Sequence, residues 1–182
     1  MADRRPRTDA TGRGQGTMKG SILQINVSKS GVPKLPVAEA TVTPLGIEGD
    51  LHEHPEIHGG PRQALLLITA EGIEDLTRAG FALYPGALGE NITTQGLDRR
   101  AWRLGQRWGI GPDVIVEFTK IRGPCRTIQV YGPRIQTAIY DAAVRDGDPS
   151  SLRWGLSGFY ARVVRPGAIR RGDAIAFLDE AV

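Results

Sequence analysis

The chain has 182 residues, of which 40% are hydrophobic, and a formal net charge of +3; this length is typical of one domain with a sizeable core. Its single cysteine excludes an intramolecular disulfide and therefore a disulfide-stapled secreted fold. No apolar run approaches the ~18 residues of a membrane-spanning helix. We therefore expect a cytoplasmic protein without membrane contact, and the 24 glycines and 12 prolines indicate many turns between short strands.

The excess positive charge lies in the first twenty residues, and the remainder of the chain is balanced. A nucleic-acid-binding domain normally has a basic face on its folded part, so we expect no nucleic-acid partner. Residues 1–18 contain almost nothing that could be buried. We predict a disordered tail over 1–18 and one folded domain over 19–182.

Hydrophobic patterns predict a mainly β domain. Apolar or alternating runs bounded by Gly and Pro indicate strands at 21–27, 64–69, 91–94, 106–110, 114–120, 158–165 and 174–178. One helix is expected at about 70–79, with Thr69 as N-cap and Gly80 beyond its C-terminus. A second is expected at 134–145, where apolar residues recur at helical spacing. About seven strands with two helical insertions indicate a β-barrel-like fold.

Cys125 is the first candidate for chemistry. It follows the Gly123-Pro124 turn and lies between Arg122 and Arg126. The turn can present the thiol, and the positive charges favour its thiolate form. A thiolate is both a nucleophile and a soft-metal ligand. The alternative is a small buried cysteine at the end of a strand.

The segment 52–63 contains three histidines and a glycine-rich turn. His52, His54 and His58 could hold zinc, although Pro55 breaks any helix that would align them, and a solvated polar loop is the alternative. Free backbone N–H groups at Gly59-Gly60, beside Arg62, could hold an anion such as phosphate. The alternative there is a turn that needs glycine at positive φ.

Gly89-Glu90-Asn91-Ile92 leads into one of the predicted strands. The Glu and Asn side chains either buttress the turn through hydrogen bonds to the backbone or contact a ligand. The first interpretation is favoured by the residue types.

Together these segments resemble the MOSC domain, which also forms the C-terminus of molybdenum cofactor sulfurases. The resemblance covers about residues 20–179 and rests on the order and spacing of its motifs. These are residues 46–50 with His52, His58-Gly59-Gly60, Gln63 and Glu71, Pro85-Gly86, residues 89–92, Gly96-Leu97, Leu104-Gly105, Pro124-Cys125, residues 158–163 and Gly172-Asp173. The chain looks like a short stand-alone bacterial member.

The resemblance implies a β-barrel with a cleft for the molybdenum cofactor (molybdopterin). In a reductase of N-hydroxylated compounds, Cys125 would be catalytic as the molybdenum ligand, and His58 would bond cofactor or substrate. The cofactor-binding residues would be Arg122, Arg62 and Arg126 at the phosphate, Asn91 at the pterin edge, and Gly59 and Gly60 in the turn. Asp50 would orient the histidine-rich loop.

We rank the three arginines as candidate ligands of the cofactor's phosphate. Arg122 comes first, because the Gly123-Pro124 turn allows it to reach the side of the sulfur, whereas Arg126 follows Cys125 directly and comes third. Arg62 is second: it stands one residue earlier than the arginine of His-Gly-Gly-Pro-Asp-Arg, the pattern often found in reductase members. We expect Cys125 to lie in a cleft on which His58, Gly59, Gly60 and Asn91 converge.

Two other functions compete with a reductase. As a sulfur or cofactor carrier, the protein would take a persulfide on Cys125 from a cysteine desulfurase-type donor, without turnover of its own. As an interaction domain, it would use Cys125 only structurally. A reductase instead needs a small-molecule substrate and an electron-donor protein, since the sequence shows no flavin or iron–sulfur module.

Overall fold

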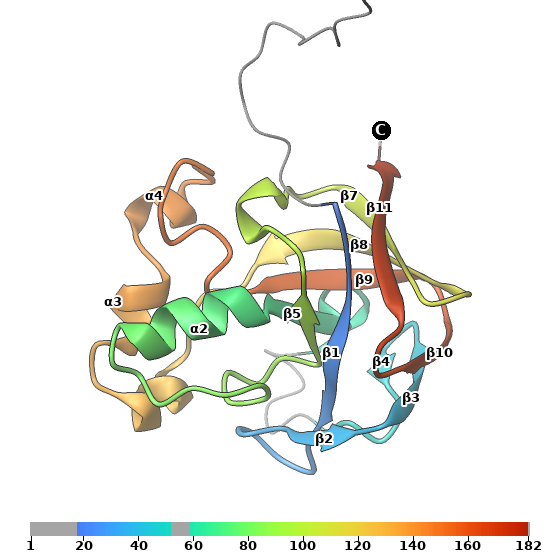
Figure 1. The fold of residues 1–182 in the computed structure, drawn as a ribbon, viewed down its shortest axis with the longest axis horizontal. Helices are drawn as coiled ribbons and strands as arrows, with labels where there is room; N and C mark the ends of the chain where they lie inside the picture. Colours follow the sequence, from blue (N-terminus) through green and yellow to red (C-terminus); the bar gives the residue numbers. More distant parts are fainter. Residues whose placement is uncertain (1–17, 52–58, 182) are drawn as a thin grey trace, which may run out of the picture.

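The computed structural model describes residues 18–51 and 59–181, and seven of its strands close into a barrel (Figure 1). Their order is β11-β7-β8-β9-β5-β6-β1, and β1 also pairs with β11 to complete the ring. The pairs are antiparallel except β5 with β6, which is parallel. The bounds are β1 Lys19–Val27, β5 Leu65–Thr69, β6 Ile92–Gln95, β7 Gln106–Ile110, β8 Val114–Ile121, β9 Phe159–Arg165 and β11 Ala174–Glu180. The predicted mainly β, barrel-like fold is confirmed.

The barrel interior is filled by alternate residues of its strands. In β7, and in β8 as far as Phe118, every second residue is buried, as expected for strands with one face on a core. The rings of Trp102, Trp108, Phe118 and Phe159 pack there with centroids 4.9–6.1 Å apart. By contrast, all five residues of β5 are buried. A strand buried on both faces loses its alternation, which explains its continuous apolar sequence.

Helix α2 (Ala70–Arg78) follows β5 directly, as the sequence predicted. The Thr69 hydroxyl accepts from the Gly72 N–H at 3.1 Å, and Gly80 has the φ of +98° that suits a residue just past a helix. The second predicted helix is wrong as one piece: α3 (Ile135–Ile139) and α4 (Ala142–Arg145) replace it. Tyr140 is extended between them, and the Asp141 carboxylate caps α4 by accepting from the Val144 N–H at 2.8 Å.

Four short strands lie outside the predicted set. Strand β2 (Leu35–Val37) extends the large sheet beside β1, while β3 (Glu39–Thr43), β4 (Gly46–Ile47) and β10 (Gly167–Arg170) form a second sheet. In Figure 1 this small sheet lies on the right of the barrel and the helices on the left. These strands are only two to five residues long, which is too short for their periodicity to be recognised from sequence.

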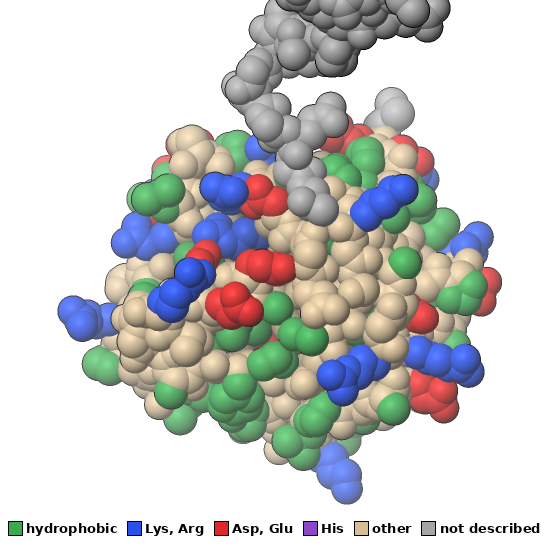
Figure 2. Space-filling view, viewed as in Figure 1, with side chains coloured by type: hydrophobic (Ala, Val, Ile, Leu, Met, Phe, Trp, Pro, Cys, Tyr) green, Lys and Arg blue, Asp and Glu red, His purple; other side chains and the backbone are tan. Residues whose placement is uncertain are grey.

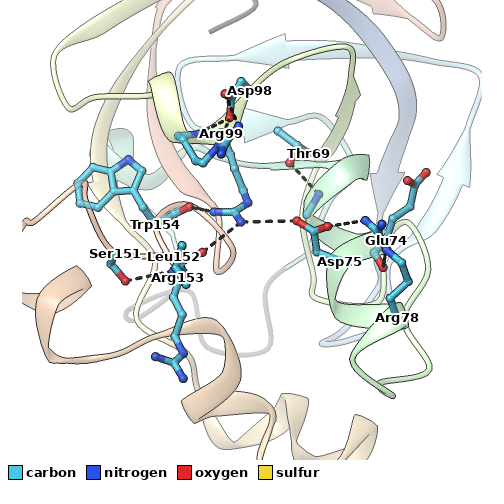
Figure 3. Close-up of polar contacts among 12 residues, drawn as sticks. Thr69, Glu74, Asp75, Arg78, Asp98, Arg99, Ser151, Leu152, Arg153 and Trp154 are labelled. Carbon is cyan, nitrogen blue, oxygen red and sulfur yellow. Dashed lines mark hydrogen bonds and ion pairs between the residues drawn. The ribbon is translucent and has the colours of Figure 1, made fainter. Parts of the chain in front are cut away.

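Arg99 connects α2 with the segment 152–154 (Figure 3). It begins the 3-10 helix η2 (Arg99–Ala101), and its Nη2 donates to the Leu152 carbonyl at 3.1 Å and lies 3.6 Å from Asp75 of α2. Its Nη1 donates to the Trp154 carbonyl. On the face shown in Figure 2, basic and acidic side chains are interspersed. In the described part of the chain no helix is long and apolar enough to cross a membrane.

Candidate functional site

A pocket opens beside Cys125, with about 650 Å³ of space free of protein atoms, part of it open to solvent. Its walls come from segments far apart in the sequence: the turn between β1 and β2, the segment after β8, the starts of β5 and β9, and the turn before β6. The side chains that line it are Val32, Lys34, Leu51, Gln63, Leu66, Leu88, Asn91, Arg122, Cys125, Thr127 and Tyr160, with backbone from Gly31 and Gly89. A second, mostly apolar groove beside α2, lined by residues such as Leu23 and Ile73, includes no cysteine or histidine in its lining.

Cys125 is half-buried and stands at the N-terminal end of the 3-10 helix η3 (Arg126–Tyr131). Burial alone would raise the pKa of its thiol. The Thr127 hydroxyl, the Arg122 charge and the backbone N–H groups of Thr127 and Ile128 outweigh burial and hold that pKa below its usual value. A larger share of the sulfur is therefore thiolate than in an ordinary cysteine.

The Arg122 guanidinium lies beside this sulfur, with its Nη2 3.8 Å from Cys125 Sγ. The residue follows β8 directly, and its backbone N–H donates to the Gly158 carbonyl at 3.0 Å, which fixes the start of the turn. Only 4% of Arg122 is exposed, and its Nη1 has no hydrogen-bond partner in the part of the chain that the structure describes. A buried guanidinium N–H without an acceptor is costly, and such groups often mark a ligand position.

Asp50 joins three segments of the pocket wall. Its Oδ2 accepts from the Lys34 ammonium and from Asn91 Nδ2, the latter at 2.7 Å, and its Oδ1 accepts from the Ser28 N–H at 2.8 Å. The Lys34 and Asp50 side chains are only 6% and 1% exposed. Burial lowers the pKa of Lys34, and the Asp50 charge opposes that shift. Asn91 extends the network, since its Oδ1 accepts from the Leu66 N–H at 3.0 Å.

Glu90 precedes the pocket residue Asn91 in the chain and is fully buried. Its Oε1 accepts from the Gly86 N–H at 2.6 Å and from the Thr93 hydroxyl at 2.8 Å, so it buttresses the turn. Its Oε2 has no partner among the residues described, and burial raises the pKa of the carboxyl. Gly86 has a φ of +93°, and a Cβ there would lie 2.3 Å from the Lys34 carbonyl oxygen, so this contact requires glycine.

The structure brings three of the predicted site residues, Asn91, Arg122 and Cys125, to this one pocket. Gly59 and Gly60 do not line it, and Gly60 has the positive φ of a tight turn before the 3-10 helix η1 (Pro61–Gln63).

Arg62 and Arg126 are exposed and are also absent from the lining. Arg62 lies on η1 and Arg126 on the first turn of η3, where neighbouring side chains diverge instead of alternating as on a strand. His52, His54 and His58 lie outside the described residues. Within the residues described, no group of three or more metal-ligating His, Cys, Asp or Glu side chains occurs.

Sequence reasoning missed Lys34 as a site residue. A lysine in a proline-flanked turn is normally exposed, so nothing in its local sequence indicated burial. Gln63, Thr127 and Tyr160 were missed as lining residues for the same reason: their roles depend on how distant segments pack. Asp50 was expected to orient the histidine-rich loop, and the structure shows it bound to Ser28, Lys34 and Asn91.

Comparison with known proteins gives a consistent result. The family model for the MOSC domain matches residues 54–176. Protein YiiM of Escherichia coli is 33% identical over 148 residues, which are 77% of this chain and 60% of YiiM. A protein named "Reductase" from Gibberella moniliformis is 28% identical over 139 residues, 74% of this chain and 23% of that protein. The chain thus spans less than two thirds of either relative.

Solved structures show the same architecture. YiiM from Geobacillus stearothermophilus is 25% identical with a TM-score of 0.64, and the match covers 88% of this chain and 75% of that one. The YUAD protein of Bacillus subtilis is 20% identical with a TM-score of 0.63, and the match covers 87% of this chain and 94% of that one. The second likeness shows the fold alone.

Proposed function

The chain belongs to the MOSC domain family, and we propose that its Cys125 pocket binds the molybdenum cofactor and reduces N-hydroxylated small molecules. The observation that carries this proposal is the pairing of Cys125 with Arg122. One pocket holds a sulfur biased toward thiolate and a buried cation, one N–H group of which has no partner among the residues described. The name of the Gibberella moniliformis relative agrees with a reductive reaction.

The residues present fit such a cofactor. Cys125 offers a soft thiolate ligand to the metal. Lys34 and Arg122 offer positive charge to an anionic group, and Asn91 offers an amide to a polar ring edge. No carboxylate lies among the described lining residues, so nothing there repels an anion. When bound, the cofactor would supply a centre that passes two electrons to the substrate.

The chain's own residues would bind and orient the reactants. The overall reaction breaks the N–O bond of the substrate and consumes two electrons and two protons, giving the parent nitrogen compound and water. Electrons would come from a donor protein. The apolar side chains of Val32, Leu66 and Leu88 would shield the reacting groups from water.

A sulfur carrier is the second candidate, favoured by the half-exposed, thiolate-biased state of Cys125. In that function the Cys125 thiolate would attack the persulfide of a desulfurase-type donor. The outer sulfur would pass to Cys125, and the donor's thiolate would leave. This step needs a partner to reach the sulfur but no substrate pocket.

The decisive experiment measures molybdenum and pterin in protein produced in a cofactor-competent host. We expect both in the wild type, loss of molybdenum in Cys125→Ser, and at least tenfold less pterin in Arg122→Met. Arg126→Met is the matched control, because this exposed arginine also adjoins Cys125, and it should retain both. Reduction of an amidoxime with a chemical electron donor then tests turnover.

Other outcomes would reject the proposal. Wild-type protein without metal and pterin, but with one added sulfur atom on Cys125 after incubation with a cysteine desulfurase and cysteine, would establish the carrier. Equal cofactor content in wild type and Cys125→Ser would remove Cys125 as the metal ligand.

A further inference from the structure

The Cys125 sulfur is accessible to small reactants as well as to a metal. The residue is half-buried and lines a pocket of about 650 Å³ that is partly open to solvent. Exposure is one of the properties that make a cysteine susceptible to oxidation by hydroperoxides. The reaction gains further speed where preorganised donors stabilise the negative charge that develops on the departing peroxide oxygen.

Arg122 supplies such donors beside the sulfur. Its Nη2 lies 3.8 Å from Cys125 Sγ, and its backbone N–H donates to the Gly158 carbonyl, which anchors the residue. Only 4% of Arg122 is exposed, and Nη1 has no hydrogen-bond partner in the described part of the chain. A buried guanidinium N–H without an acceptor therefore lies next to a nucleophile, where it is a stronger donor than it would be in water.

Thr127 adds a second donor to the same place. Its side chain lines the pocket, and its hydroxyl interacts with the Cys125 sulfur. Because a hydroxyl both donates and accepts, Thr127 can hold the attacked peroxide oxygen while Arg122 holds the departing one. No carboxylate lies among the described lining residues, so nothing there opposes the developing negative charge.

An oxidised Cys125 has no partner cysteine within this chain. It is the single cysteine among the 182 residues. A sulfenic acid without a second cysteine condenses with an external thiol or is oxidised further. Recovery of the thiol therefore requires a small-molecule thiol such as glutathione, which would enter from the solvent side of the pocket.

We propose that Cys125 is a hydroperoxide-reactive cysteine, which hydrogen peroxide converts to a sulfenic acid while Arg122 stabilises the departing oxygen. The sulfur attacks one peroxide oxygen: an S–O bond forms, the O–O bond breaks, and two electrons pass from sulfur to peroxide. The departing oxygen takes up the thiol proton and leaves as water. One external thiol then converts the sulfenic acid to a mixed disulfide and a second water, and another thiol releases Cys125 and carries the disulfide away.

This reaction goes beyond the proposed function and does not depend on it. A sulfenic acid or a mixed disulfide offers a metal no thiolate. Where Cys125 is the metal ligand, its oxidation would therefore prevent ligation until a thiol restores the cysteine. The same sulfur would then act as a redox switch for the proposed function.

The test uses cofactor-free protein, made in a host without molybdopterin, and compares two reactions of Cys125 at one pH. Sulfenic acid formed by hydrogen peroxide is trapped with dimedone and followed by mass spectrometry, and alkylation by iodoacetamide is followed in parallel. Because the share of thiolate enters both rates equally, the ratio of peroxide rate to alkylation rate isolates the effect of the pocket on O–O cleavage. We expect this ratio to be roughly tenfold or more higher in the folded protein than in the chain unfolded in urea.

Variants of the flanking arginines test the role of Arg122. Arg122→Met should lower the ratio roughly 10- to 100-fold, the scale of a charged hydrogen bond. Arg126→Met is the matched control, because this exposed arginine adjoins Cys125 without lining the pocket, and it should leave the ratio within about twofold of wild type. If Arg122→Met fails to fold, Arg122→Lys takes its place: it keeps the charge, loses the planar set of donors and should still lower the ratio.

Four results would overturn the proposal. They are the absence of a dimedone adduct on the wild type, a ratio no higher in the folded than in the unfolded chain, a ratio in the folded Arg122 variant equal to that of wild type, and a sulfenic acid that glutathione does not return to the thiol. The two proposals can fail separately. Absence of molybdenum and pterin with the expected peroxide ratios rejects only the reductase, and a protein that loads the cofactor but gives no dimedone adduct when cofactor-free rejects only the peroxide reaction.

Discussion

Replacing Asp50 with alanine should destabilise the protein far more than breaking an ion pair on its surface. The variant leaves the Lys34 ammonium buried without its counter-charge and removes the acceptor of the Asn91 amide and the Ser28 N–H. Because the two charged side chains are 6% and 1% exposed, water screens them little. Removing one partner of a buried pair costs about 3–5 kcal/mol, which corresponds to a fall in Tm of roughly 6–20 °C for a domain of this size.

Urea unfolding followed by tryptophan fluorescence measures this loss, since Trp102 and Trp108 are buried in the barrel. Asp179→Ala is the control: its pair with Arg107 has side chains 52% and 37% exposed, so about 1 kcal/mol or less is expected. The double variant Asp50→Ala/Lys34→Met should lose less than the sum of its single variants. A loss in Asp50→Ala no larger than that in Asp179→Ala would refute the assigned role of the buried pair.

Three further predictions concern the neighbouring residues. Burial raises the pKa of Glu90, so folding of the wild type becomes less favourable as pH rises above about 4.5, the ordinary pKa of a glutamate. Glu90→Gln should therefore gain stability relative to wild type, by up to ~1.4 kcal/mol per pH unit, until the raised pKa of Glu90 is passed. A pH-independent difference in urea unfolding would contradict this. Alkylation of Cys125 should reach half its maximal rate at a pH below 9.0, and Arg122→Met should move that midpoint upward in a stopped-time iodoacetamide assay. Gly158→Ala should lower the free energy of unfolding in urea by more than Gly147→Ala does. Both glycines have positive φ, which costs each alanine variant about 1–3 kcal/mol. At Gly158 the new Cβ would also lie 2.8 Å from the Leu67 carbonyl oxygen, whereas at Gly147 it would meet nothing within 4 Å.

The barrel was predictable because its strands carry their own signals. Strand β7 appears over Gln106–Ile110 as predicted, and β8 ends within one residue of its predicted position. Thr69 and Gly80 mark the ends of α2 through side-chain capping and positive φ, which depend only on local sequence. The split between α3 and α4 was missed because Asp141 can equally stand within a helix or cap one, and the periodicity on both sides is the same.

The pocket was only partly predictable, for a different physical reason. Cys125 and Arg122 are neighbours in sequence, so their contact follows from one turn. The contact between Asp50 and Lys34 depends on the closure of β1 against β2 and on the turn at Gly86, which the local sequence does not encode. A buried ion pair is therefore a property of the packed fold, and neither residue type nor spacing distinguishes Lys34 from an exposed lysine.

Buried charge also connects the stability of this protein to its ligand. Lys34, Arg122 and Glu90 lose hydration on folding, and the described contacts leave Arg122 Nη1 and Glu90 Oε2 without partners, so the fold carries a cost that its apolar barrel must offset. An anion bound only by the folded state would stabilise it in proportion to RT ln(1 + [L]/Kd), about 2.7 kcal/mol at a hundredfold excess over Kd. Wild-type protein should therefore gain more in Tm from its ligand than Arg122→Met does, even where that variant is more stable without ligand. Such an inverse relation between unliganded stability and ligand-induced gain is the behaviour expected of a residue that serves binding, and a merely structural arginine would not produce it.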